Sequence, residues 1–314
     1  MKKVLITGGN GYLGARLSLH LANEGYAVTP LCYPEKPLDE SWLNKMDMVL
    51  VGDVRDDRFL TEISENSYDV IIHLVSLDHN QSNGNPIFVS SVNISPVWSI
   101  LDIFSKKGLK KFVYFSTMQV YGTLTSEIVT EQKETATLNA YALTHNIGEM
   151  ICNHYNRTSN TECRIVRLSN SYGAPIFNEN NCWWLVVNDL CKNAYFDKQI
   201  VLQSDGTPQR DFIHGWDVCN AIKTIIESSS PITTFNVSSG KTLTIMDIAL
   251  KIQEVYKSKY NNILPIKAAP LKENLKKEKF LIDNSQIRGI GFEPKWSLEQ
   301  GITDLFNYFE RDNE

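Results

Sequence analysis

Residues 4–14 read Val-Leu-Ile-Thr-Gly-Gly-Asn-Gly-Tyr-Leu-Gly, an aliphatic run that ends in a glycine-rich turn. Beyond the turn, leucines recur at the four-residue spacing of a helix as far as Gly25. Gly8 permits the tight turn, and Gly11 lets the backbone approach a pyrophosphate on the N–H groups of the helix N-terminus. Gly14 allows the helix to pack closely on the strand. The spacing therefore favours a dinucleotide-binding turn over an ordinary glycine-rich connection.

The composition is that of a globular protein with a sizeable core. The chain has 314 residues, of which 42% are hydrophobic, and a net charge of −5 without a basic run. This length suits one large domain or two small domains that share a cleft. The acidic balance disfavours nucleic acid and anionic membranes as partners, and the first apolar run is too short for a signal peptide or a membrane span. The six cysteines show no CxxC spacing, which predicts reduced thiols in a cytoplasmic protein and no metal site.

Strands and helices alternate along the first half of the chain. Further strands are expected at residues 27–32, 48–51, 69–74, 111–116 and 163–169, and helices at 92–107 and 139–156. Successive strand–helix units give parallel strands joined by crossover helices. The sequence therefore predicts an α/β fold with a Rossmann-type, doubly wound parallel sheet.

The pattern changes after residue 173, where loops lengthen. We expect helices at 183–193, 216–228, 246–258 and 298–310, and short strands at 200–202, 234–237 and 263–266. This predicts a dinucleotide-binding domain at 1–172 and a smaller α/β substrate lobe at 173–314. Segments near 210–240 are expected to return to the first domain.

Three positions near strand ends bear on the cofactor. The second strand ends in Cys32, which is neither the acid that would bind a ribose nor an arginine for a phosphate. NAD is therefore preferred, while Lys36 keeps NADP open. Asp53 is predicted to accept a hydrogen bond from an adenine amino group, the alternative being a helix N-cap or an acid in a first helical turn. His73 lies between apolar residues and is predicted to be a packed, hydrogen-bonded histidine.

In doubly wound sheets, ligands bind beyond the carboxyl ends of the strands. Several of the residues expected at strand ends can therefore line one cleft. Tyr141 and His145 share a face of the helix at 139–156 because they are four residues apart, and Thr117 can reach the same place. A tyrosine near a nicotinamide can take a proton from a substrate alcohol. Its reference pKa of ~10 requires a nearby cation to lower it.

The chain resembles the extended short-chain dehydrogenase/reductase family of nucleotide-sugar epimerases, dehydratases and reductases. The matching stretches are 7–14, 52–55, 72–74, 92–93, 115–122, 141–149, 167–173 and 210–214 with Asp217. The resemblance implies that Thr117 aids Tyr141, that Asn93 sits by the catalytic helix, and that Asn170 and Arg210 hold a sugar nucleotide's diphosphate. The alternative for Arg210 is a surface ion pair with Asp211. A homodimer through helices 92–107 and 139–156 is also implied.

The candidate site residues fall into three groups. The predicted catalytic residues are Thr117, Tyr141 and His145. The predicted cofactor-binding residues are Gly8, Gly11, Tyr12, Leu13, Gly14, Asp53, Val54, Leu74, Val75, Asn93, Tyr141, His145 and Leu168. The predicted substrate-binding residues are Thr117, Asn170, Arg210 and Lys272.

The sequence also departs from the family pattern. His145 stands where the family has a lysine that holds the nicotinamide ribose and supplies the cation, and a histidine is largely neutral at pH 7. Met118 and Gln119 replace the Asp-Glu pair of the dehydratases, which argues against elimination of water. Lys272 stands near the place of an arginine expected to grip the diphosphate.

Together these features predict an NAD-dependent oxidoreductase that acts at C4 of a nucleotide-activated sugar. The favoured form is a 4-dehydrogenase of a GDP-linked hexose or heptose for surface polysaccharide biosynthesis. A 4-epimerase is one alternative. A non-catalytic dinucleotide-binding sensor or scaffold is another, motivated by the missing lysine.

Overall fold

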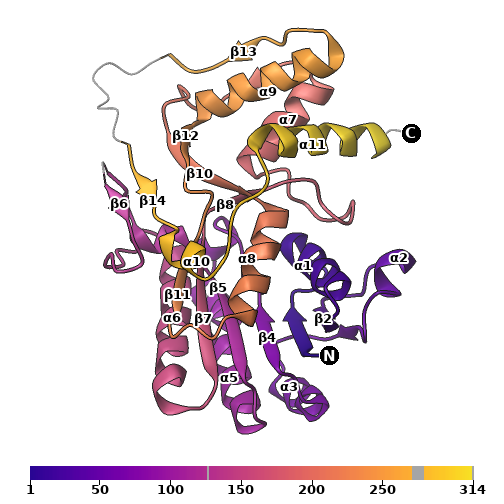
Figure 1. The fold of residues 1–314 in the computed structure, drawn as a ribbon, viewed down its shortest axis with the longest axis vertical. Helices are drawn as coiled ribbons and strands as arrows, with labels where there is room; N and C mark the ends of the chain where they lie inside the picture. The colour runs from indigo at the N-terminus through magenta and orange to yellow at the C-terminus, as the bar shows by residue number, and fades with distance from the viewer. Residues whose placement is uncertain (126, 271–278, 313–314) are drawn as a thin grey trace.

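A seven-stranded parallel sheet forms the centre of the molecule (Figure 1). The structure is a computed structural model that describes residues 1–125, 127–270 and 279–312. The strand order is β11-β7-β5-β4-β1-β2-β3. The bounds are β1 Lys3–Thr7, β2 Ala27–Cys32, β3 Leu50–Val51, β4 Val70–His73, β5 Lys111–Thr117, β7 Glu162–Leu168 and β11 Thr234–Val237. From β1 the chain adds strands outward to β3 at one edge, and from β4 it adds strands outward to β11 at the other edge. This reversal between β1 and β4 confirms the doubly wound Rossmann-type sheet.

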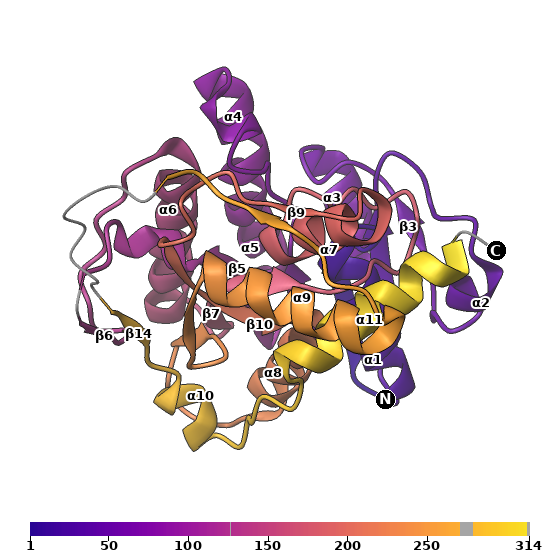
Figure 2. The same ribbon diagram turned by 90° about the horizontal axis from the view of Figure 1, so that it is seen from above.

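The central strand shows why the sheet is covered on both faces. In β1, Val4 and Ile6 join one apolar core and Leu5 joins another, and all three are completely buried. Alternate side chains of a strand point to opposite faces, so a run buried throughout needs helices on both sides. Figure 2 shows these two layers. Helices α1 (Tyr12–Asn23) and α8 (Gly215–Glu227) form one layer, and α3 (Asp57–Ile63), α5 (Ser95–Lys106) and α6 (Ala140–Thr158) form the other.

The single helix predicted at 92–107 is wrong. The chain forms α4 (Pro86–Asn93) and then α5, and the two are separated at Ile94, whose φ of −116° departs from helical geometry. Asn85 caps α4 by accepting hydrogen bonds from the next two backbone N–H groups of the helix. An asparagine before a proline is a helix-start signal that the apolar repeat at 92–107 does not contain.

A smaller lobe begins directly at the carboxyl end of β7. Only Ser169 separates β7 from β8 (Asn170–Tyr172), which pairs with β10 (Gln209–His214), and β10 pairs in turn with β12 (Thr242–Thr244). These three short strands were not predicted from the sequence. They carry their own apolar core beneath α7 (Val186–Phe196), α9 (Ile245–Tyr260) and α11 (Leu298–Asp312). This lobe lies over the edge of the large sheet where ligands are expected (Figure 1).

Smaller elements complete the described chain. They are α2 (Glu40–Leu43), α10 (Ser285–Gly289), the pair β9 (Ile200–Val201) with β13 (Ile266–Lys267), and the pair β6 (Ile128–Val129) with β14 (Leu281–Ile282). The strands predicted at 48–51 and 263–266 are shorter or shifted, because only residues 50–51 and 266–267 find pairing partners. Of the segments expected to return to the first domain, β11 pairs with β7 in the large sheet and α8 packs on α1, whereas β10 stays in the lobe.

Candidate active site

The glycine turn after β1 is shaped for an anion. Gly8 has a φ of +72°, which favours glycine, and a Cβ at Gly14 would lie 2.0 Å from the Gly8 carbonyl oxygen. Helix α1 begins after Gly11, which offers no side-chain cap, and the first turn holds no acidic residue. Its backbone N–H groups and the positive end of its dipole are therefore free to bind a negatively charged group. This turn fits the pyrophosphate of a dinucleotide.

Gly14→Ala is expected to destabilise the fold by about 1–3 kcal/mol, because the added methyl group forces the helix away from the Gly8 backbone. It should also weaken NAD binding. Denaturant unfolding and NAD titration test both effects. Gly289→Ala is the matched control, since a Cβ there meets nothing within 4 Å. Equal stability of the two variants would contradict the close-packing role.

Asp53 follows β3 but does not cap a helix. It accepts hydrogen bonds from the Arg55 backbone N–H and Nε, both at 2.9 Å. The cap of α3 is Asp56, which accepts from the Arg58 N–H at 2.9 Å, so the N-cap interpretation of Asp53 is wrong. The Arg55 guanidinium lowers the pKa of Asp53 and keeps its carboxylate charged. A role toward adenine stays a prediction.

His73 at the end of β4 is packed and hydrogen-bonded, as predicted. Its side chain is 1% exposed, and Nδ1 lies 2.8 Å from the Thr7 hydroxyl. Burial lowers the pKa of His73 to about 3, so the imidazole is neutral. The Thr7 hydroxyl also accepts a hydrogen bond from the Leu74 N–H at 3.3 Å. His73 therefore ties the ends of β1 and β4 together beneath the nucleotide turn.

The three predicted catalytic residues come together at the start of α6. Asn139 caps this helix by accepting from the Ala142 N–H at 2.8 Å, which places Tyr141 in the first turn. The rings of Tyr141 and His145 meet edge-on with centroids 4.4 Å apart. Thr117, the last residue of β5, hydrogen-bonds Tyr141. Burial raises the pKa of Tyr141 to about 12, and the Thr117 hydrogen bond opposes this only in part.

His145 lies in an uncharged, buried environment. It is 4% exposed, with Nε2 3.2 Å from the Ser76 hydroxyl and Nδ1 3.3 Å from the Tyr114 hydroxyl. Burial lowers the pKa of His145 to about 4, although the Phe115 backbone acts to raise it. The imidazole is thus neutral at pH 7 and supplies no cation to Tyr141. Neither hydroxyl partner was predicted from the sequence.

Asn93 joins the catalytic helix to the loop after β4. Its Oδ1 accepts from the Leu77 N–H at 2.8 Å, and its Nδ2 donates to the Thr144 hydroxyl at 3.0 Å. The side chain is 2% exposed, so these hydrogen bonds are shielded from water. Asn93 therefore fixes the loop that carries Ser76 relative to α6.

Two of the predicted substrate residues, Asn170 on β8 and Arg210 on β10, lie on the lobe strands, whereas Thr117 ends β5 of the large sheet. The Nδ2 group of Asn170 donates to the Asp211 carbonyl at 2.9 Å, and Arg210 is exposed, with Nη1 donating to the Gln209 carbonyl. The expected alternative, an ion pair between Arg210 and Asp211, does not form. Asp211 is completely buried and accepts from Ser169 Oγ at 2.7 Å and from backbone and hydroxyl groups near β12. Lys272 lies outside the described residues.

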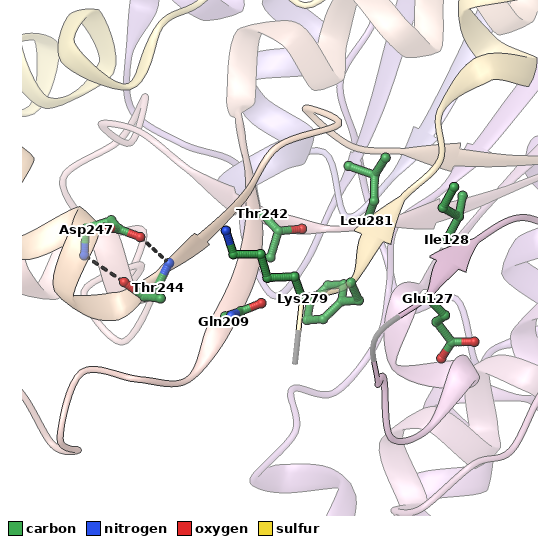
Figure 3. A pocket seen from close by; sticks show the side chains of 9 residues that line it. Glu127, Ile128, Gln209, Thr242, Thr244, Asp247, Lys279 and Leu281 are labelled. Atoms are coloured by element: carbon green, nitrogen blue, oxygen red, sulfur yellow. Dashed lines mark hydrogen bonds between the residues drawn. The ribbon is translucent and has the colours of Figure 1, made fainter. Parts of the chain in front are cut away.

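A hollow of about 620 Å³ opens beside β10 and β12 (Figure 3). In Figure 3 the side chain of Lys279 extends across it toward Thr242. The register pairs Gln209 with Thr244 and Arg210 with Leu243, so the hollow lies on the opposite face of β10 from Arg210. It is therefore separate from the side chain predicted to hold a diphosphate. The lining residues are Glu127, Ile128, Gln209, Thr242, Thr244, Asp247, Lys279, Phe280 and Leu281.

Residues 4–238 match the model of the NAD dependent epimerase/dehydratase family. The chain belongs to this family. Membership confirms the predicted relationship to nucleotide-sugar epimerases and dehydratases and the expectation of NAD as cofactor. The nucleotide turn and the Tyr141 pair both fall within the matched residues.

Curated relatives of this family member span its whole length. Low-salt glycan biosynthesis protein Agl12 of Haloferax volcanii is 23% identical over 318 residues, covering 99% of each chain. The UDP-glucose 4-epimerase of Rhizobium meliloti is 24% identical, covering 99% of this chain and 98% of the relative. The dTDP-glucose 4,6-dehydratase of Streptomyces niveus is 22% identical, covering 99% and 93%.

Solved structures of similar proteins share the same fold. The UDP-glucose 4-epimerase of Thermotoga maritima, solved with UDP-glucose, has a TM-score of 0.84 at 22% identity and covers 99% of this chain and 100% of its own. The UDP-glucuronic acid 4-epimerase from Bacillus cereus, solved with UDP-glucuronic acid and NAD, has a TM-score of 0.79 at 22% identity, covering 98% and 99%. At these identities the likeness shows the fold.

Proposed function

We propose that this protein oxidises C4 of a nucleotide-activated sugar, with Tyr141 as the base. The observation that carries the proposal is the meeting of Tyr141, Thr117 and His145 at the carboxyl edge of the sheet. The nucleotide turn of the same sheet adjoins this edge, because a Cβ at Gly8 would contact Val75 in the loop after β4. A proton acceptor and a dinucleotide turn on one edge suit alcohol oxidation.

Each residue has a distinct proposed role. NAD, when bound, supplies the hydride acceptor. Tyr141 takes the proton of the sugar hydroxyl, Thr117 hydrogen-bonds the tyrosine, and His145 holds the nicotinamide ribose. Asn170 and Arg210 bind the diphosphate, for which the planar guanidinium is well suited. Dehydration is disfavoured, because Met118 is a buried thioether and Gln119, an amide, accepts from Asn139 at 3.2 Å.

Two overall reactions begin with this oxidation. Release of the 4-keto sugar makes the protein a 4-dehydrogenase, and we propose a GDP-linked hexose or heptose destined for surface polysaccharide as its substrate. The second candidate is a 4-epimerase, in which the keto sugar is reduced again on its other face. The UDP-glucose 4-epimerase of Rhizobium meliloti among the relatives favours this candidate.

Turnover with a panel of sugar nucleotides tests the proposal. Purified protein is mixed with NAD and GDP-, UDP- or dTDP-linked sugars, and both nicotinamide absorbance and product mass are followed. A dehydrogenase accumulates reduced nicotinamide and a product lighter by two hydrogens. An epimerase yields an isomer of unchanged mass without net reduction. Tight NAD binding without turnover of any sugar would favour the sensor or scaffold.

We also propose a homodimer through α4, α5 and α6. Residues 86–106 are the one segment of the described chain that is long and apolar enough to cross a membrane by composition, and within it only α5 packs beside the sheet. Apolar side chains on these helices remain exposed, including Trp98 at 58% and Met150 at 62%. A second copy packed on this face would cover them.

Trp98→Glu combined with Met150→Glu is expected to convert a dimer to a monomer, because two buried charges would face the partner helices. Sedimentation velocity measures the change. Leu250→Glu on α9 is the matched control, since Leu250 is 50% exposed on a different surface. A dimer that survives the double variant would place the interface elsewhere.

A further inference from the structure

We propose that Tyr114 is a positioning residue that fixes which nitrogen of His145 carries the proton, and that Gly148 makes room for its hydroxyl. For its consequence in catalysis this inference rests on the proposed function. It adds to that function a residue outside the predicted set. The geometry of the His145 surroundings can be tested without any sugar substrate.

Tyr114 reaches His145 across Gly148 of α6, where no side chain stands in the way. Its hydroxyl lies 3.3 Å from Nδ1 of His145, and the two rings have centroids 6.0 Å apart. A Cβ at Gly148 would lie 2.2 Å from this hydroxyl and 2.3 Å from the ring carbon that carries it. On the other side, the His73 ring stacks on Tyr114 at 6.3 Å with an angle of 16°. The hydroxyl is therefore held in one place.

The hydrogen-bond donors around His145 favour a proton on Nε2. The Ser76 hydroxyl has one proton, which it donates to the Leu77 carbonyl at 2.9 Å. With that proton donated to Leu77, Ser76 Oγ is left to accept from His145, and this arrangement places the proton on Nε2. In a neutral imidazole Nδ1 is then an acceptor, and the Tyr114 hydroxyl is the donor that it faces. Burial raises the pKa of Tyr114 well above 10, so this proton stays in place.

The tautomer matters because a neutral histidine has one N–H donor where a lysine has three. With the proton on Nε2, that donor points toward Ser76 in the loop after β4. This loop adjoins the nucleotide turn, since a Cβ at Gly8 would lie 3.6 Å from the Val75 nitrogen. With the proton on Nδ1, the donor would point into the sheet at Tyr114 instead. Tyr114 thus directs the single donor of His145 toward the Ser76 side, where a bound nicotinamide ribose would take the place of Ser76 as its acceptor.

Nitrogen NMR of histidine-labelled protein, free and with NAD, tests this assignment directly. The wild-type protein is expected to show His145 protonated on Nε2. Tyr114→Phe removes only the hydroxyl and should shift His145 toward a mixture of tautomers, as should Gly148→Ala, which displaces the hydroxyl. Tyr68→Phe, a buried tyrosine with its ring against Phe104, is the matched control and should leave His145 unchanged. An unchanged His145 signal in Tyr114→Phe overturns the proposal.

NAD affinity provides a second readout through a double-mutant cycle. Tyr114→Phe should weaken NAD binding about fivefold to tenfold in the wild-type background, the loss of one well-placed hydrogen bond. The same change in a His145→Lys background should have no effect, because an ammonium group donates in any orientation. Equal losses in both backgrounds would show a merely structural role. Neither readout involves a sugar, so the proposed function can fail while this inference holds.

Discussion

Tyr141→Phe is expected to lower kcat for sugar oxidation by about a thousandfold while leaving NAD bound, which is the range of a lost general base. The change removes only the hydroxyl. The ring keeps its edge contact with His145 at 4.4 Å, and the Asn139 cap of α6 is untouched. Stopped-flow formation of reduced nicotinamide measures the chemical step, and fluorescence titration measures NAD affinity.

The control for this variant is Tyr155→Phe, which removes a hydroxyl from a buried tyrosine further along the same helix. Its kcat should match the wild type. Activity of Tyr141→Phe within tenfold of the wild type would exclude Tyr141 as the base. A thousandfold loss together with lost NAD binding would indicate a disturbed site and leave the hydroxyl without a demonstrated role.

The nucleotide turn was predictable because its causes are local. Gly8 needs a positive φ. Gly14 must carry no Cβ, because a Cβ there would lie 2.0 Å from the Gly8 carbonyl oxygen. Each requirement leaves a glycine at a fixed spacing in the sequence. The pairing of Tyr141 with His145 was equally predictable, since four residues on a helix bring side chains together.

The surroundings of His145 were not predictable in the same way. Ser76 and Tyr114 are separated from His145 by 69 and 31 residues, and only the finished sheet brings them to its two nitrogens. The environment of Asp211 is similar, because its partners Ser169 and Ser239 come from different strand ends. Short strands such as β8 and β12, with three residues each, also carry too few residues for a periodic pattern.

The rate of sugar oxidation is expected to rise about tenfold per pH unit between roughly pH 6 and 9. Tyr141 acts in its deprotonated form, and burial raises its pKa to about 12. Below that pKa, each unit of pH increases the phenolate fraction tenfold. The nearby Asp78 carboxylate also acts to raise this pKa, while Thr117 acts to lower it. His145 has a pKa of about 4 and stays neutral over the whole range.

His145→Lys should raise the rate at pH 7 and flatten the profile, because an ammonium group beside the phenol lowers the pKa of Tyr141. His145→Gln is the matched control, since it keeps a polar side chain but adds no charge, and its profile should stay steep. Initial rates of nicotinamide reduction at saturating NAD measure all three proteins.

A flat wild-type profile would mean that another group supplies the missing positive charge. Arg167 is not available to supply that charge, because its guanidinium is already paired with the Glu149 carboxylate at 2.7 Å. A steep wild-type profile that flattens only with lysine would show that residue 145 governs the basicity of Tyr141.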